Sequence, residues 1–137
     1  MYPRDTTYRL AQTPMDYRRC HALMAQRNVV RRIKRPTIMA ERGGALIGML
    51  ATEAMDTMIV CGPLVVSKDL ARPAFVVIRL VELYEALMRA AGVRVFVFAV
   101  PRQNARWMNW LLTLGLEPWQ QQGEDIWFWR EVRAHGQ

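Results

Sequence analysis

Few side chains in this sequence have the types and spacing that covalent or metal chemistry requires. The single serine, Ser67, and the two histidines, His21 and His135, stand in no motif that would assemble a serine, histidine and aspartate triad. The cysteines, Cys20 and Cys61, lack zinc-ligand spacing with those histidines. No glycine-rich loop ending in Gly-Lys-Ser or Gly-Lys-Thr is present. The sequence therefore predicts no triad hydrolase, no metal site and no nucleotide-binding loop of that type.

The excess of basic side chains is concentrated in the N-terminal quarter of the sequence. Residues 1–35 hold nine basic and two acidic side chains, whereas residues 36–137 hold ten of each, so the whole net charge of +7 lies in the N-terminal segment. Unpaired arginines resist desolvation, so we expect this charge to face solvent or an anionic partner. Such a partner is an acidic protein, a nucleic acid or the phosphates of a cofactor; the alternative is a solvated face. The density is highest in what we term the basic cluster: Arg27, Arg31, Arg32, Lys34 and Arg35.

The elements at the centre of the fold are expected between residues 57 and 115. Met58 to Val66 is an apolar run broken by Gly62-Pro63, and Val93 to Val100 is a second apolar run. Between them, Arg72-Pro73 and Ala91-Gly92 are start and stop signals for a helix of about five turns. This order predicts a βαβ unit whose two strands are parallel and lie at the sheet centre.

The remaining segments predict shorter elements around that unit. Trp107, Trp110 and Leu111 have the spacing of a buried helix face, whereas Trp127 and Trp129 share one face of a strand, as core or as a stacking platform. Cys20 and Cys61 are both expected to be reduced core residues. The expected elements are a strand at Thr7–Gln12, a helix from Pro14 to about Arg27, a loop or short helix up to Pro36, a hairpin of Thr37–Glu41 and Ala45–Thr52, a turn at Glu53–Asp56, a helix at Gln103–Leu114 closed by Gly115, and a hairpin of Glu117–Gln122 and Asp125–Val132.

Length and composition favour a single domain over residues 1–137. A composition that is 52% hydrophobic allows a core without disulfides or metals. No apolar run approaches the roughly 20 residues that span a bilayer, and the N-terminus has no signal-peptide apolar region. We therefore expect a cytoplasmic protein with no membrane partner.

The predicted order of elements resembles the GNAT superfamily of acyl-CoA-dependent N-acyltransferases. The resemblance runs from Tyr8 to Val132, and its most specific points are the strand, loop and helix of Leu64–Leu80 and the segment Asn104–Leu116. It implies an α/β (α+β) fold with a mixed sheet of six to seven strands, ordered β-α(α)-β-β-β-α-β-α-β-β, whose central strands splay apart. Proline cannot donate to a central ladder, so Gly62-Pro63 fits such a splay.

In this family the cofactor is acetyl-CoA or a related acyl-CoA, and its pantetheine arm bonds to the first central strand. The pyrophosphate lies at the N-terminus of the next helix, where free N–H groups and the helix dipole favour an anion. The resemblance thus implies the following cofactor-binding residues: Leu64, Val65, Val66, Lys68, Arg72, Ala74, Phe75 and Asn104.

The sequence departs from the family pattern at the residues that carry chemistry. The usual loop of the family reads glutamine or arginine-x-x-glycine-x-glycine or alanine, and its three specified positions align here with Ala71, Ala74 and Val76. The usual acid, a tyrosine, falls on Leu111. The usual base is a carboxylate near the central strands, and the candidates are Glu41, Glu53 and Asp56.

Two functions follow as hypotheses. The first is an N-acetyltransferase that transfers an acetyl group from acetyl-CoA to an amine, with the basic cluster beside the acceptor site and an acidic peptide or anionic small amine as acceptor. The second is a non-catalytic GNAT-like interaction module, such as a phage virion or head-assembly protein. The motif losses favour the second hypothesis, whereas the frequency of active members in the family favours the first.

Overall fold

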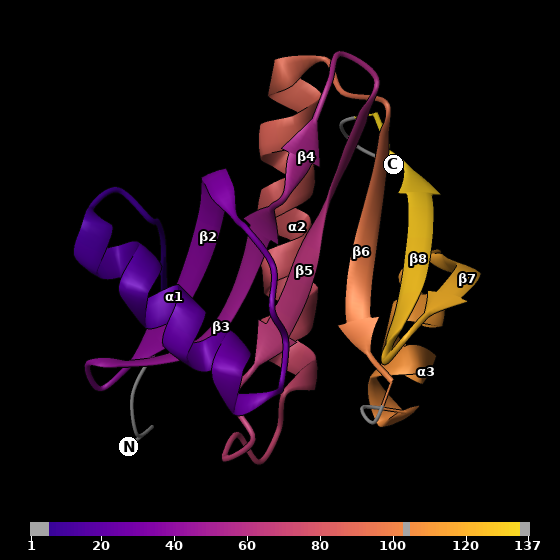
Figure 1. The fold of residues 1–137 in the computed structure, drawn as a ribbon. Helices are drawn as coiled ribbons and strands as arrows, with labels where there is room; N and C mark the ends of the chain where they lie inside the picture. The colour runs from indigo at the N-terminus through magenta and orange to yellow at the C-terminus, as the bar shows by residue number, and fades with distance from the viewer. Residues whose placement is uncertain (1–5, 103–104, 135–137) are drawn as a thin grey trace.

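A mixed β-sheet of eight strands forms the centre of the computed structural model, which describes residues 6–102 and 105–134. The strand order is β1-β2-β3-β5-β6-β8-β7, with β4 paired to β5 (Figure 1). This confirms the expected fold class, and the additional strand is β4, within a segment expected to be only a turn. The elements are β1 (Thr7–Leu10), α1 (Pro14–Gln26), β2 (Lys34–Arg42), β3 (Ala45–Thr52), β4 (Ala54–Met55), β5 (Ile59–Val66), α2 (Ala74–Ala91), β6 (Val95–Pro101), α3 (Ala105–Thr113), β7 (Glu117–Gln122) and β8 (Asp125–Glu131).

The predicted βαβ unit is confirmed. Strands β5 and β6 are parallel neighbours at the middle of the sheet, and α2 connects them. Helix α2 begins after Pro73 and ends at Gly92, whose φ of 81° is a left-handed conformation that glycine adopts without strain. Its apolar stripe, which includes Leu80 and Tyr84, is buried against the sheet.

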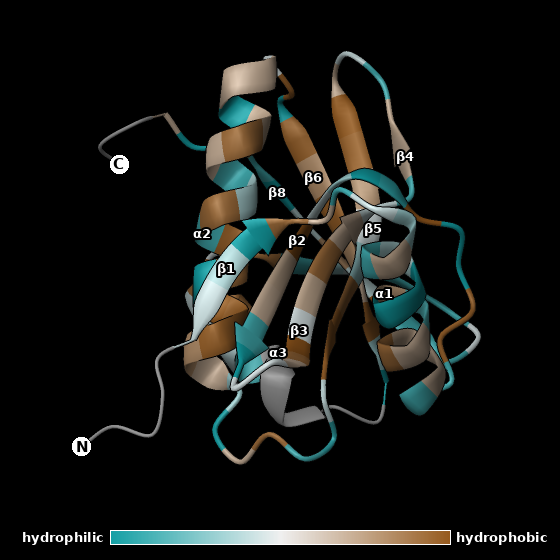
Figure 2. Ribbon diagram, turned by 90° about the vertical axis from the view of Figure 1, so that its left-hand side faces the viewer, coloured by the Kyte–Doolittle hydropathy of each residue, from teal (hydrophilic) through white to brown (hydrophobic). Residues whose placement is uncertain are grey.

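The helices cover the two faces of the sheet unequally. Helices α2 and α3 lie on one face and α1 on the other, as the two ribbon views show (Figure 1, Figure 2). On the first face α2 packs on Phe96, Phe98 and Phe128. On the second face Met24 of α1 packs on Met49 of β3. Helix α1 therefore covers β3 and β5, and in the described part of the chain no helix covers the same face of β6 and β8.

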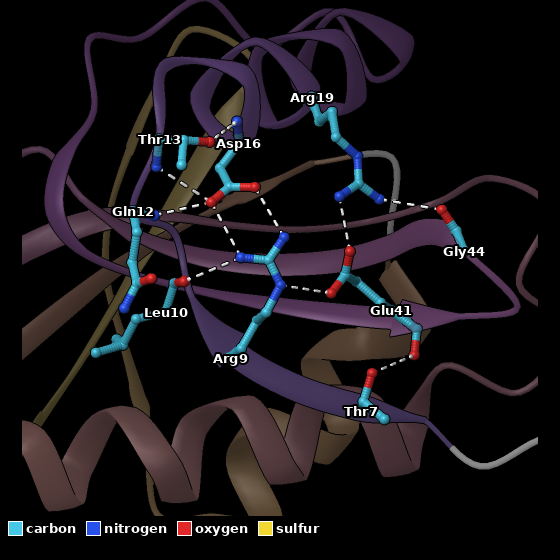
Figure 3. A network of polar contacts seen from close by, with 9 residues as sticks. All are labelled: Thr7, Arg9, Leu10, Gln12, Thr13, Asp16, Arg19, Glu41 and Gly44. Carbon is cyan, nitrogen blue, oxygen red and sulfur yellow. Dashed lines mark hydrogen bonds and ion pairs between the residues drawn. The ribbon is translucent and has the colours of Figure 1, made fainter.

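Helix α1 is anchored to β1 and β2 by a polar network (Figure 3). The Asp16 carboxylate accepts hydrogen bonds from both Arg9 Nη atoms and from the N–H groups of Gln12 and Thr13. The Thr13 hydroxyl accepts in return from the Asp16 N–H, which completes a capping box. Glu41 of β2 accepts from Arg9 Nε at 2.8 Å and from Arg19 of α1 at 2.7 Å.

One expected boundary, the start of the second strand, differs from the structure. The segment after α1 is a loop over residues 27–33, which was one of the two expected forms, but β2 begins at Lys34 and not at Thr37, so Pro36 lies inside a strand. The β2–β3 register is irregular between Lys34 and Ile38, and a proline is tolerated there because no ladder N–H is required. In α3, Leu111 is fully buried and Trp110 packs on the core as predicted, whereas the side chain of Trp107 lies outside the described residues.

Candidate functional site

The two central strands separate at their C-terminal ends. The β5–β6 ladder runs from Ile59 opposite Val95 to Pro63 opposite Ala99 and then stops. Beyond that point β5 continues to pair with β3, where Val66 lies opposite Gly48. The predicted splay is therefore confirmed, and we term the unpaired side of residues 64–66 the open edge.

A proline on β6 explains why the ladder stops. In the next hydrogen bond of the β5–β6 ladder, the C=O of Leu64 would accept from the N–H of residue 101. That residue is Pro101, which has no N–H. Pro63 has a different role from the one expected. It lies where β5 changes partner from β4 to β3, next to Gly62, whose backbone is so close to the Ala51 carbonyl that no Cβ would fit.

Backbone groups of alternate residues face the open edge. The N–H of Ser67 donates to the Ile47 carbonyl of β3 at 2.9 Å, so Val65, two residues earlier, also turns its backbone groups toward β3. Leu64 and Val66 turn theirs away from β3, and the Val66 C=O accepts from Arg27 Nε at 3.0 Å. The open edge thus presents the Leu64 C=O and the Val66 N–H, and the expectation that Val65 also faces it is wrong. The side chains of all three residues are fully buried.

The N-terminus of α2 lies at the end of the sheet where β5 ends, which is also the end with the open edge (Figure 1). Pro73 occupies the N-cap without a side-chain cap, and the N–H groups of Ala74, Phe75 and Val76 have no hydrogen-bond partner among the described residues. Lys68 and Arg72 are exposed beside this turn, and their side chains make no ion pair within the described ranges. The Phe75 side chain is 76% exposed, and Asn104 lies outside the described residues.

The three candidate carboxylates are all engaged. Glu41 is held by Arg9 and Arg19 at the β1 side of the sheet. Asp56 accepts from the N–H groups of Met58 and Ile59 in the β4–β5 turn, and these bonds lower the pKa of its carboxyl. Neither residue is brought to the open edge.

Glu53 is the candidate that the structure places beside β5. Its N–H donates to the Cys61 carbonyl at 2.7 Å, and its carboxylate accepts from Arg31 Nη1 at 3.0 Å. The same guanidinium donates to Asp125 of β8 and lies 4.8 Å from the centroid of the Trp127 ring. Sequence reasoning missed Asp125, because nothing distinguished it from other polar residues at a hairpin end.

The basic cluster is not one uniform surface, and its expected exposure is wrong for Arg31. The Arg31 side chain is only 18% exposed because two carboxylates pair with it. Arg27 bonds to Val66, and Arg35 donates to the Gln12 carbonyl at 2.9 Å. Arg32, Lys34 and Arg35 are exposed as expected.

An apolar groove lies on the uncovered face of β5, β6, β8 and β7. It consists of two adjoining hollows of about 310 Å³ each, which share Ile59, Val97 and Trp119. Cys61 lines one hollow and is half-buried, so it is not the core residue expected, and burial raises the pKa of its thiol. The described residues that line it are Ile59, Cys61, Val95, Val97, Trp119, Gln120, Gln122, Trp127 and Trp129.

The described residues lack two kinds of feature, a metal-binding group and a membrane-spanning helix. Residues 6–102 and 105–134 contain no group of histidine, cysteine, aspartate or glutamate side chains arranged to hold a metal ion. Among the helices described, none is long and apolar enough to cross a membrane.

Comparison with solved structures identifies the fold. The chain is similar to Ard1 from Thermoplasma volcanium, with a TM-score of 0.71 at 12% identity over 94% of this chain and 99% of that chain. It is similar to the ribosomal-protein-S18-alanine N-acetyltransferase of Escherichia coli, with a TM-score of 0.69 at 14% identity over 96% and 97% of the chains.

A shorter match is to the paiA N-acetyltransferase of Thermoplasma acidophilum in complex with coenzyme A, with a TM-score of 0.57 at 17% identity. This chain spans 59% of that protein, and the match covers 69% of this chain. No family model and no curated protein sequence matches the chain. The fold is therefore that of the GNAT N-acetyltransferases.

Proposed function

We propose that this protein is an N-acyltransferase that uses acetyl-CoA to acetylate an amine. The observation that carries the proposal is the open edge, where a central strand of a GNAT fold leaves the Leu64 C=O and the Val66 N–H without a strand partner. Unpaired backbone groups on a central strand are costly, and a ligand with amide groups can pair with them as an added strand does.

The chain's residues fit the two polar parts of the cofactor. The pantetheine arm has amides that match one C=O and one N–H at the open edge. The N–H groups of Ala74, Phe75 and Val76 and the helix dipole suit the phosphates. The exposed Lys68 and Arg72 side chains add charge at the same turn, in place of the glycines that the family pattern has there.

The reaction would rely mainly on positioning. The amine nitrogen attacks the thioester carbonyl carbon, the carbon–sulfur bond breaks, the sulfur leaves with the electron pair, and the ammonium proton ends on the sulfur or in water. Leu111, at the position of the usual acid, is fully buried in the core and cannot donate a proton. Glu53 is the nearest candidate base, and its ion pair with Arg31 must loosen before it accepts one. Holding an amine against a thioester supplies much of the rate without a side-chain acid.

A second candidate function is a non-catalytic module that retains the fold. It is favoured by one specific observation: the three candidate carboxylates are all bound by arginines or backbone N–H groups. The two candidate functions differ in whether the protein transfers the acetyl group of bound acetyl-CoA to an amine.

Titration with acetyl-CoA, followed by thiol release with a panel of amines, tests both candidates. A ligand at about 100 times its dissociation constant stabilises the folded state by roughly 2.7 kcal/mol, which raises the melting temperature by several degrees. Stabilisation with thiol release supports the enzyme, and stabilisation without release from any amine supports the module. A flat melting temperature at millimolar acetyl-CoA contradicts the proposed function.

A further inference from the structure

The apolar groove has a composition that selects against charged ligands. Its lining contains apolar and aromatic side chains with two glutamine amides, and none of the described residues that line either hollow is charged. Trp119 is 59% exposed and Ile59 is 47% exposed, so large apolar surfaces face solvent. Contiguous exposed apolar surface of this kind marks a site for an apolar partner or ligand.

One residue of the groove wall, Trp127, carries a buried polar group that lacks a partner within the described part of the chain. Trp127 is only 7% exposed, and its indole N–H has no hydrogen-bond acceptor among the described residues. The Arg31 guanidinium lies over the ring but offers donors only. A buried unpaired N–H is costly, and an acceptor oxygen on a ligand would relieve that cost.

The groove leads to the open edge. Cys61 lies opposite Val97, and both line the groove. The last paired residues, Pro63 and Ala99, are two positions further along the same strands. Two residues of a β-strand span about 7 Å, which is the distance from Cys61 and Val97 to this last pair. A molecule seated in the groove would therefore have one end next to the position where the two strands part.

We propose that the groove binds the acceptor, and that the acceptor is an amine carrying a bulky apolar side chain and a nearby carbonyl oxygen. This inference rests on the proposed function and names its substrate class. The apolar side chain fills the hollow between Ile59, Val97 and Trp119, and the carbonyl oxygen accepts from Trp127 Nε1. The anionic acceptor expected from the basic cluster does not match this groove, because Arg31 is already paired with Glu53 and Asp125.

Amino-acid amides are matched probes because they share the amine and the carbonyl and differ only in the side chain. The experiment titrates L-phenylalaninamide, L-leucinamide, glycinamide and L-aspartic acid α-amide onto ¹⁵N-labelled protein without acetyl-CoA and follows the indole N–H signals. Trp119→Phe and Trp127→Phe assign two of those signals. Burying one bulky apolar side chain should make the first two probes bind roughly 10- to 100-fold more tightly than glycinamide. The Trp119 and Trp127 signals should move, the Trp127 proton downfield, while Trp110 on the opposite face stays unchanged.

Variants separate groove binding from a general loss of structure. Trp119→Ala and, independently, Ile59→Thr should abolish most of the preference for L-phenylalaninamide over glycinamide. Met15→Ala removes an apolar side chain that is 57% exposed on α1, away from the groove, and should leave the preference unchanged.

Equal affinity for glycinamide and L-phenylalaninamide, or tighter binding of the aspartic acid amide, would overturn the inference. Indole shifts that depend on protein concentration without any probe would also overturn it, because a second copy of the chain would then occupy the groove. A protein that binds acetyl-CoA without discriminating among the probes contradicts this inference alone. Failure to bind acetyl-CoA contradicts the proposed function, whichever amide binds.

Discussion

Arg31 Nη2 lies 2.5 Å from Asp125 Oδ2, which joins two residues that are 94 positions apart in the chain. Arg31 belongs to the connection between α1 and β2, and Asp125 is the first residue of β8. The same guanidinium also pairs with Glu53, which lies beside β5. Since β5 and β8 are the two neighbours of β6, this one side chain links the connection to strands on both sides of β6. The connection is therefore held over the face of the sheet that carries the apolar groove.

Substitution of Arg31 should destabilise the fold, although it belongs to a basic cluster. Arg31→Gln leaves the partly buried Glu53 and Asp125 carboxylates without their partner, so we expect a loss of about 1–3 kcal/mol in the free energy of unfolding. Arg32→Gln, at an exposed neighbour, should change it by less than about 0.5 kcal/mol. Urea denaturation of the two variants checks this, and equal stability would show that the Arg31 ion pairs contribute nothing.

The anchoring of α1 should depend on pH through Asp16. Hydrogen bonds from Arg9 and from two backbone N–H groups lower the pKa of this carboxyl well below its usual range. A depressed pKa contributes stability that is fully present above about pH 4, the unfolded value, and is lost as the pH falls toward the folded value. The melting temperature of Asp16→Asn should therefore lie below that of the parent at pH 7, and the difference should shrink between pH 4 and pH 2. A constant difference over that range would argue against the ion pair.

The N-cap of α1 gives a separate measure of the same anchoring. Thr13→Ala removes the hydroxyl that accepts from the Asp16 N–H and should cost about 1 kcal/mol. Thr13→Ser, which keeps the hydroxyl, is the matched control and should cost little. A Thr13→Ala variant as stable as Thr13→Ser would show that the capping box is dispensable.

The fold was predictable because its signals are local. The apolar runs around Gly62-Pro63 and Val93 to Val100, with a helix between them, specify the parallel pair at the sheet centre, and Gly92 and Gly115 end helices where a positive φ is required. The splay was predicted as well, but from the wrong proline. Pro101 ends the ladder, and its role depends on a β5–β6 register that no local pattern contains.

The candidate site was less predictable because it depends on distant pairings. The charge pattern placed Arg31 on the surface, since its partners lie 22 and 94 residues away. Trp127 and Trp129 were seen to share a strand face, but nothing in the sequence showed that the face would lack a covering helix. Trp127 and Trp129 line a groove because no described helix covers their face of the sheet.

Charge reversal at the N-terminus of α2 should weaken acetyl-CoA binding. Lys68→Glu and Arg72→Glu each replace an attractive charge beside the phosphates with a repulsive one, so we expect about a tenfold or greater loss of affinity that is smaller at high salt. Arg94→Glu changes the net charge equally at an exposed position at the other end of β6 and is the control. Calorimetric titration checks this, and equal affinities for the three variants would place the phosphates elsewhere.

The two cysteines should differ in reactivity. Burial raises the pKa of the Cys20 thiol to about 11, and Cys20 is fully buried, so iodoacetamide should modify it only after unfolding. Cys61 is half-buried in the groove and should react slowly at neutral pH and faster as the pH rises. L-phenylalaninamide should slow the modification of Cys61 if it occupies the groove. Mass spectrometry of the labelled protein distinguishes the two sites.

The most direct test of the open edge compares two adjacent amides. Val66 turns its N–H away from β3, toward the position where acetyl-CoA would pair, whereas Val65 turns its N–H toward Met49 of β3. Hydrogen exchange measured by NMR, with and without saturating acetyl-CoA, reports on both. We predict that exchange at the Val66 N–H slows by about tenfold or more while the Val65 N–H changes much less. Unchanged exchange at Val66 in the presence of bound acetyl-CoA would show that the open edge is not where the cofactor binds.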